Sequence, residues 1–264
     1  MTASVQDIMP GLHIRQYRQA RFDRIVSPFP GVIRVELGEK KVGAGADTLS
    51  VGAGSYVILP EHTEMTVENL PEPGMGYAAT ALAFSRAVFE AAYSRFDPML
   101  LGRAETVQSC AAGPEVAAAF EAAMLGLANG APKPRTDLLS ERLALELALV
   151  GACLPHPRPT RFADTLRECL AADISRSWTA ERAAATLGIS SSTIRRRLRA
   201  EGTAFSFVLR ELRLASGLHL LQTTRWPIAS VAHAVGYTSP SRFSQRFRAR
   251  FGMAPGDVRK PPSG

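Results

Sequence analysis

The sequence predicts an α+β protein of two domains, a small antiparallel β-barrel with flanking helices and an all-helical domain. Two observations support this fold class. Short segments rich in β-branched residues, broken by Gly and Pro, fill the first part of the chain, whereas a helix–glycine–helix pattern occurs twice in the last part. Several prolines interrupt any helix between the two parts. We expect domains at 1–154 and 162–260, with a proline-rich linker at 155–161.

Five short segments of the N-terminal domain are typical of strands. Each contains β-branched residues and lies close to Gly or Pro. They are residues 25–26, 31–37, 47–51, 55–59 and 63–68. We expect these segments to form the barrel, with the glycine-containing stretches 43–47 and 52–54 as hairpin turns.

Helical patterns follow in the same domain, at residues 85–94, 114–127 and 137–154. The last of these is the most regular, and it contains more leucines than one narrow stripe can bury. We expect one face of this helix to pack across the barrel. This packing gives no partner for the leucines on a second face of the helix.

The stretch from Pro227 to Pro255 gives the main indication of function. Pro227 suits the first turn of a helix, an apolar stripe follows at helical spacing, and Gly236 ends that helix. After a short turn, a second helix has three phenylalanines on one face and Ser, Arg and Gln on the other. Two short helices joined by a glycine turn, the second basic on its outer face, form a helix-turn-helix unit for the DNA major groove. The alternative is an ordinary helical bundle with its arginines in solvent.

A second copy of this unit argues against the ordinary bundle. Thr179 is a suitable N-cap, Gly188 ends the first helix, and a second helix with four arginines starts at Ser191. Between the two copies, the apolar positions of Phe205–Gln222 fit one long helix that joins them.

Charge distinguishes the two domains. Residues 160–264 contain 17 Lys and Arg against 7 Asp and Glu, a net charge of +10, whereas residues 1–159 carry −3. This asymmetry is typical of a polyanion-binding module attached to a domain with another role. A membrane surface also attracts basic residues, but these lie on short helices without an amphipathic anchor, so we expect no membrane contact. The sequence has no apolar run of 18 residues and no signal-peptide pattern, so we expect a cytoplasmic protein.

The sequence offers no catalytic or metal-binding constellation. The five histidines lack ligand spacing, and the motifs GxxxxGK[ST] and GxSxG are absent. Cys110, Cys153 and Cys169 are scattered among Ala and Leu, so we interpret them as buried, reduced residues, with a thiol sensor as the alternative. We therefore expect no enzyme activity, no metal and no cofactor.

The C-terminal pattern resembles that of AraC/XylS transcription regulators over residues 162–260. The matching positions of the second helix-turn-helix unit are Ile228, Ala229, Ala232, Val235, Gly236, Tyr237, Ser239, Ser241, Phe243, Phe247, Phe251, Gly252 and Pro255. Val258 departs from the pattern, because an aromatic residue usually precedes the final basic pair. The resemblance implies a sequence-specific regulator of the activator type, with double-stranded DNA and RNA polymerase as partners.

The resemblance also indicates the DNA contacts. Base-reading positions correspond to Ser192, Arg195 and Arg196 on the first recognition helix and to Ser241, Arg242 and Gln245 on the second. Phosphate contacts are expected from Ser191, Thr193, Arg199, Arg246 and Arg248. Arg196 is the strongest base-reading candidate, because arginine can donate two hydrogen bonds to guanine O6 and N7. For any single arginine, a phosphate contact or a solvated charge is the alternative, and the orientation of Arg197 stays open.

The N-terminal domain resembles the cupin-like domain with which many AraC-type regulators hold an effector. The resemblance rests on residues 51–60, where Ser55 replaces the usual Asp. It implies a domain that binds a small molecule, forms a homodimer, or both; a protein-interaction module without a ligand is the alternative. A cupin enzyme would need clustered histidines, and only His62 lies in the expected barrel. Arg34 is a candidate partner for an acidic effector.

The use of this region by family members further implies a dimer seam on the long helix at 137–154. The candidate residues are Leu139, Leu143, Glu146, Leu147 and Val150. Such a seam is compatible with packing of the opposite helix face on the barrel.

Overall fold

The computed structural model describes residues 12–27, 30–44, 47–61, 63–84, 86–95, 107–111, 113–152 and 161–259. The described residues up to 152 belong to one compact unit, and those from 161 onward belong to another. The expected pairing of an antiparallel β domain with an all-helical domain is confirmed. Within these residues, no helix combines the length and the apolar character that are needed to cross a bilayer.

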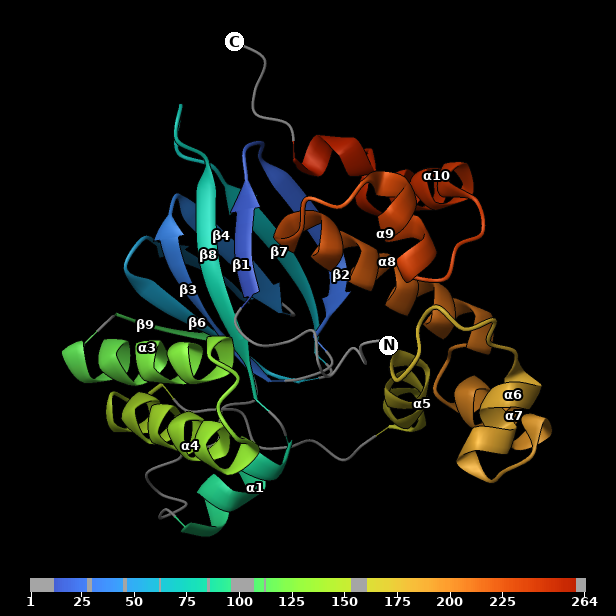
Figure 1. The fold of residues 1–264 in the computed structure, drawn as a ribbon, viewed down its shortest axis with the longest axis horizontal. Coiled ribbons are helices and arrows are strands. Elements are labelled where there is room, and N and C mark those ends of the chain that lie inside the picture. Colours follow the sequence, from blue (N-terminus) through green and yellow to red (C-terminus); the bar gives the residue numbers. More distant parts are fainter. Residues whose placement is uncertain are drawn as a thin grey trace. The chain divides into compact units, whose positions relative to one another are not determined.

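Two antiparallel sheets form the N-terminal unit (Figure 1). The first has the strand order β1-β8-β3-β6-β9, and the second has the order β2-β7-β4-β5. The strands of the first sheet are β1 Leu12–Gln16, β8 Tyr77–Ala83, β3 Gly31–Leu37, β6 Ser55–Leu59 and β9 Gln108–Ala111. Those of the second sheet are β2 Ala20–Val26, β7 Glu64–Leu70, β4 Glu39–Ala44 and β5 Asp47–Gly52.

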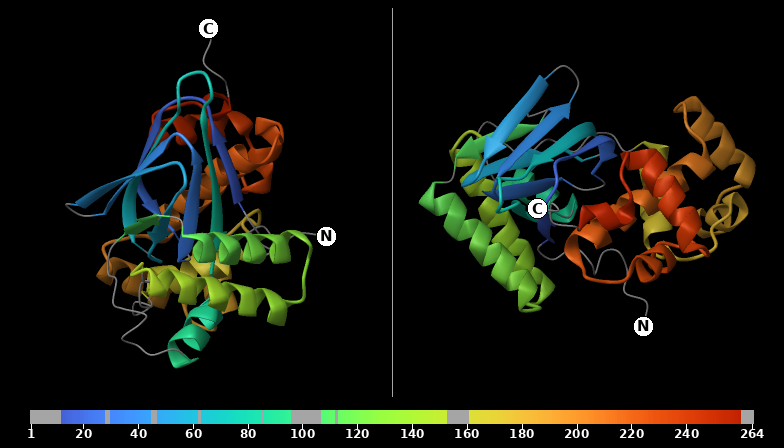
Figure 2. Two further views of the ribbon diagram at one scale, coloured as in Figure 1. Left: turned by 90° about the vertical axis from the view of Figure 1, so that its left-hand side faces the viewer. Right: turned by 90° about the horizontal axis from the view of Figure 1, so that it is seen from above.

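The first sheet is buried on both faces. On β3, Ile33 and Val35 share a core cluster with side chains of the second sheet, whereas Val32 belongs to a cluster with helical residues. This alternation follows from the two-residue period of a strand. The helices lie along the outer face of the first sheet (Figure 2). They are α3 Pro114–Ala128 and α4 Lys133–Leu149, and α1 Arg86–Arg95 packs against α4.

Helix α4 corrects part of the expected dimer seam. The helix expected at 137–154 begins and ends earlier than the sequence predicts. Leu143 and Leu147 are both 0% exposed and pack in the core, because they lie one turn apart on the face toward α3 and the sheet. Neither side chain is therefore available to a second subunit. The exposed large apolar residues of α3, α4 and the α4 C-cap are Leu125, Leu138, Leu149 and Val150.

The C-terminal unit is all helical, and it contains the two expected helix-turn-helix units joined by one long helix (Figure 1). The first unit comprises α6 Ala180–Leu187 and α7 Ser191–Ala200, preceded by α5 Phe162–Ala171. The joining helix is α8 Phe205–Thr223. The second unit comprises α9 Ile228–Ala234 and α10 Pro240–Phe251, followed by the 3₁₀ helix η2 Pro255–Val258.

Each helix-turn-helix unit packs against α8 through an apolar seam. In the first unit, Ile194 and Leu198 of α7 pack with Val208 of α8. In the second unit, the rings of Phe243 and Phe247 lie 5.5 Å apart between centroids, and those of Phe247 and Phe251 lie 4.6 Å apart. The four-residue spacing keeps all three phenylalanines on one helix face. Both seams leave the opposite faces of α7 and α10 free for another contact.

Candidate nucleic-acid interface

Helix α7 presents its polar face outward because its start and its apolar seam are both fixed. The Ser190 side chain accepts a hydrogen bond from the Thr193 backbone N–H at 3.1 Å, which satisfies one free donor of the first turn. Ile194 and Leu198 bury one face. At about 100° per residue, Arg196 lies on the side opposite to this buried pair. The expected DNA-contacting residues Ser192, Arg195, Arg196 and Arg199 are all exposed.

The four arginines of α7 differ in their partners. Arg195 donates to Glu181 of α6 at 2.9 Å, and both side chains are largely exposed. The Arg197 guanidinium lies 5.2 Å from the centroid of the Phe162 ring, so this arginine faces its own domain. Arg196 and Arg199 have no ion-pair partner among the described residues. The two arginines without a partner are therefore the ones most available for a ligand.

Hydroxyl groups surround the N-terminus of α7. The Ser190 Oγ lies 2.8 Å from the Ser192 Oγ and 2.8 Å from the Thr193 Oγ1. Ser191 and Thr193 are only partly exposed, whereas Ser192 is exposed. A helix N-terminus with free backbone N–H groups favours an anion, because the helix dipole is positive there. The hydroxyls of Ser191 and Thr193 therefore suit a phosphate, whereas the exposed Ser192 stays a candidate for a base edge.

Helix α10 has the same division between a buried and an exposed face. Ser239 caps the helix by accepting from the Arg242 backbone N–H at 3.3 Å, and Pro240 occupies the first turn. The expected contact residues Ser241, Arg242, Gln245, Arg246 and Arg248 are all exposed. Arg250 differs from them because it forms an ion pair with Glu211 of α8 at 2.5 Å.

Arg213 of α8 contacts the segment before the first helix-turn-helix unit and lies against the glycine turn of the second, and the sequence patterns do not reveal it. Its guanidinium donates to the Arg176 carbonyl at 2.8 Å and to the Ile174 carbonyl at 3.4 Å, just before α6. The same group lies 2.5 Å from the place where a Cβ on Gly236 would be. Burial lowers the pKa of Arg213. Gly236 therefore serves two purposes, a positive φ of 84° and space for this guanidinium.

Arg34, the candidate effector handle, already has two partners. It donates to Glu36 at 2.9 Å and to Glu121 of α3, and it lies 5.0 Å from the centroid of the Phe120 ring. Partial burial works to lower the pKa of Arg34, but the hydrogen bonds with the two carboxylates outweigh it, and the pKa is raised. An acidic effector would have to displace one of these carboxylates.

The other N-terminal candidates have mixed positions. Leu139 and Glu146 are partly buried and Val150 is exposed, which leaves these three of the five seam candidates with accessible surface.

His62 and Cys153 lie outside the described residues. Burial raises the pKa of both the Cys110 and the Cys169 thiol, which is the reverse of what a reactive thiol needs. Within the described residues, no group of His, Cys, Asp and Glu has the arrangement of a metal site.

A buried polar cluster inside the β domain escapes the sequence analysis. Lys40 is 2% exposed and donates to the Asn69 Oδ1 at 2.8 Å, and Asn69 donates to Gln16 at 3.0 Å. The Lys40 ammonium lies 5.5 Å from the centroid of the Tyr77 ring. Burial lowers the pKa of Lys40 to about 7. A lone lysine in a strand gives no signal for this position, because its burial depends on which face of the second sheet it occupies.

Comparison with known proteins identifies relatives of the C-terminal unit. Residues 183–261 match a family model described as a helix-turn-helix domain. The HTH-type transcriptional activator CfaD of Escherichia coli is 33% identical over 94 residues, which are 36% of either chain. A putative AraC-like transcription regulator of Streptomyces lividans is 38% identical over 100 residues, 38% of this chain and 33% of that protein. The chain thus matches about a third of the length of these relatives.

A solved structure shares the fold across both units. The structure of unsaturated fatty acid bound ToxT from Vibrio cholerae aligns with a TM-score of 0.62 over 93% of this chain and 92% of that chain. The sequence identity is 13%, so the likeness concerns the fold alone. Both proteins therefore have an antiparallel β domain that is followed along the chain by a double helix-turn-helix domain.

Proposed function

We propose that the chain is a sequence-specific transcription regulator of the AraC/XylS type, whose helices α7 and α10 enter successive major grooves of DNA. One observation carries the proposal: both helices bury an apolar seam in one compact unit and expose polar faces rich in arginine. Successive major grooves lie about 34 Å apart along the duplex, and α8 connects the two helix-turn-helix units. The match to a transcriptional activator supports activation, with RNA polymerase as a partner.

The exposed faces divide into two roles under this proposal. Arg196 lies opposite the buried seam of α7, so it reaches furthest toward the groove floor, where bidentate arginine contacts read guanine. Arg195 joins the reading face once its exposed pair with Glu181 opens, which costs little. The other base-reading residues are Ser192, Ser241, Arg242 and Gln245. The phosphate-contacting residues are Ser191, Thr193, Arg199, Arg246 and Arg248.

For the N-terminal unit, we propose the sensing of a small molecule. The support is the fold shared with ToxT, whose structure holds an unsaturated fatty acid. A specific observation favours a second candidate function, a protein contact that includes pairing with a second copy. Leu125 and Leu138 are 62% and 58% exposed on α3 and α4, two helices that pack against each other, which leaves apolar surface for a partner to cover. A thermal shift of the full chain with fatty acids separates the two, because a ligand that binds only the folded state raises its midpoint.

The DNA-binding proposal is tested by selection of binding sites from random duplexes with the full chain. We expect enriched sequences with two short informative segments whose centres lie about one helical turn, 10 base pairs, apart. Random duplexes should bind more weakly and with similar salt dependence. Enrichment of a single segment would contradict the use of both helices, and no enrichment would contradict sequence-specific binding altogether.

A further inference from the structure

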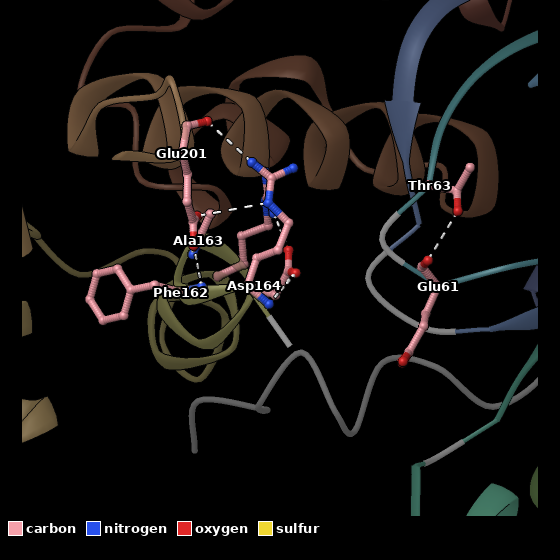
Figure 3. A network of polar contacts seen from close by, with 8 residues as sticks. Glu61, Thr63, Phe162, Ala163, Asp164 and Glu201 are labelled. Atoms are coloured by element: carbon pink, nitrogen blue, oxygen red, sulfur yellow. Dashed lines mark hydrogen bonds and ion pairs between the residues drawn. The ribbon is translucent and has the colours of Figure 1, made fainter. Parts of the chain in front are cut away.

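Glu201 connects the end of recognition helix α7 with the beginning of α5 (Figure 3). Its carboxylate accepts two backbone hydrogen bonds, from the Phe162 N–H at 2.6 Å and from the Ala163 N–H at 3.0 Å. Both donors belong to the first turn of α5, where backbone N–H groups have no partner within the helix. A carboxylate is favoured at this place because the helix dipole is positive at the N-terminus.

The carboxylate of Glu201 is held firmly relative to α7. Glu201 is the C-cap of that helix, and its backbone N–H donates to the Arg197 carbonyl at 3.2 Å and to the Leu198 carbonyl at 3.1 Å. Its own carbonyl accepts from the Arg161 guanidinium at 3.2 Å. The backbone of Glu201 therefore ends α7, while its side chain caps the first turn of α5.

A second contact joins the same two helix ends. One turn before Glu201, the Arg197 guanidinium lies over the Phe162 ring, 5.2 Å from its centroid. Asp164 closes the α5 turn from the other side, because its Oδ2 accepts from the Arg161 backbone N–H at 3.2 Å. The α5 turn is thus closed by a hydrogen bond of its own, and it is attached to α7 at two positions four residues apart.

These contacts constrain the rotation of α7 about its own axis. Charge-assisted hydrogen bonds are short and directional, so a displacement of about 1 Å breaks them. The direction of Arg196 depends on that rotation, because each residue occupies a fixed angle on the helix. The buried pair Ile194 and Leu198 determines how deeply α7 packs into its domain, whereas Glu201 fixes the position of its C-terminal end.

We propose that Glu201 is a positioning residue for DNA reading, which orients α7 by capping the first turn of α5. This inference rests on the proposed function, since it assumes that α7 reads base edges. It predicts that loss of the cap weakens sequence discrimination in the half-site of α7 and leaves the half-site of α10 unchanged. Phosphate contacts tolerate small displacements better than base contacts do, so binding to random DNA should change little.

The test compares Glu201→Ala with the matched control Glu168→Ala in the full chain. Glu168 is an exposed carboxylate on α5, so the control removes the same charge from the same domain without touching the cap of the first turn. Binding is measured on the selected duplex, on duplexes with one base changed in either half-site, and on random DNA. All measurements are made at a temperature where thermal unfolding shows both variants to be fully folded.

We expect Glu201→Ala to lose about tenfold in affinity for the selected duplex, comparable with one mismatched base pair, while Glu168→Ala stays near wild type. The penalty for base changes in the α7 half-site should shrink, and the penalty in the α10 half-site should persist. Glu201→Gln keeps the size and one carbonyl acceptor, so it should restore part of the discrimination. If Glu201→Ala does not fold, Glu201→Gln is compared with the control in the same way.

The other outcomes overturn either the proposed function or the positioning role. If wild type itself shows no discrimination between duplexes, the proposed function is wrong. If wild type discriminates and folded Glu201→Ala discriminates equally well, the positioning role is wrong. Equal losses on both half-sites and on random DNA would also overturn it, since they would indicate a general effect on the domain.

Discussion

Some arginines of the C-terminal unit are bound within their own domain, whereas others are exposed to solvent. Arg213, Arg250 and Arg259 bind carbonyls or a carboxylate of their own domain. Arg259, for example, donates to the Leu221 carbonyl at 2.8 Å and so covers the end of α8. The sequence cannot separate these groups, because the partners lie 37 to 39 residues away along the chain. Helical periodicity does predict the outward direction of Arg196.

Lys40 makes the stability of the β domain depend on pH. In the unfolded chain the lysine has a pKa near 10.5, whereas burial lowers it to about 7 in the folded state. Between these values the unfolded state binds a proton that the folded state does not, so the free energy of unfolding rises with pH. The expected slope from this group is about 1.4 kcal/mol per pH unit, and it vanishes above the unfolded pKa.

We expect Lys40→Met to remove this slope. The test is urea unfolding of wild type and variant between pH 7 and pH 10. The difference between their free energies of unfolding is followed with pH, so that the contributions of other groups cancel. Lys41→Met is the control, because Lys41 is the next residue on β4 and is only partly buried. A slope difference as large for Lys41→Met as for Lys40→Met would show that the buried amine is not its source.

At the scale of elements, two glycines mark turns that require a backbone conformation with positive φ. Gly188 and Gly236 both end the first helix of a helix-turn-helix unit with positive φ, 66° and 84°. A Cβ on Gly188 would meet nothing within 4 Å, whereas one on Gly236 would meet the Arg213 guanidinium. The two turns are alike in backbone and different in surroundings.

Gly236→Ala should therefore destabilise the domain more than Gly188→Ala. We expect Gly188→Ala to cost about 1 kcal/mol, the penalty of a left-handed conformation for a residue with a Cβ. For Gly236→Ala we expect about 2 kcal/mol or more, since Arg213 must also leave its carbonyl partners. Thermal unfolding of both variants measures the difference. In the background of Arg213→Ala the two costs should converge; an unchanged gap would mean that the arginine is not responsible.

The elements of the two units differ in how far the sequence predicts them. Both helix-turn-helix units follow from local signals, namely a capping residue, an apolar stripe and a glycine stop. The β domain depends on partners far along the chain, and local sequence patterns do not predict β1, β4, β8 and β9. Strand β8 reads YAATALA, and alanine has little preference for strands. Its identity comes from pairing with β1 and β3, which sequence periodicity alone does not reveal.

The site is predicted to a similar degree. The exposed positions of α7 and α10 follow from helical spacing, which is why every residue expected on them to read bases is exposed. The cap formed by Glu201 and the space for Arg213 at Gly236 depend on tertiary contacts, so the sequence does not indicate them. The sequence does not predict the burial of Leu143 and Leu147 for the same reason, because leucines on a helix do not indicate which face has a partner within the domain.

At the scale of the whole molecule, charge governs the salt dependence of DNA binding. The net charge of +10 in residues 160–264 supplies a non-specific attraction that weakens as salt is added. Arg199→Ala should lower the slope of log affinity against log salt by about one, because it removes one phosphate contact. Arg21→Ala, an exposed arginine on β2, is the matched control and should leave the slope unchanged. An unaltered slope in Arg199→Ala would refute its phosphate role.

The central claim is that the outward face of α7 reads bases, and Arg196→Ala tests it most directly. Affinities of wild type and Arg196→Ala are measured at one salt concentration on the selected duplex and on random DNA, with Arg21→Ala as the control for lost charge. We predict a loss of about 1–3 kcal/mol on the selected duplex and little loss on random DNA, together with relaxed specificity at one base pair. Equal losses on both duplexes would contradict the account, since they would make Arg196 a phosphate contact.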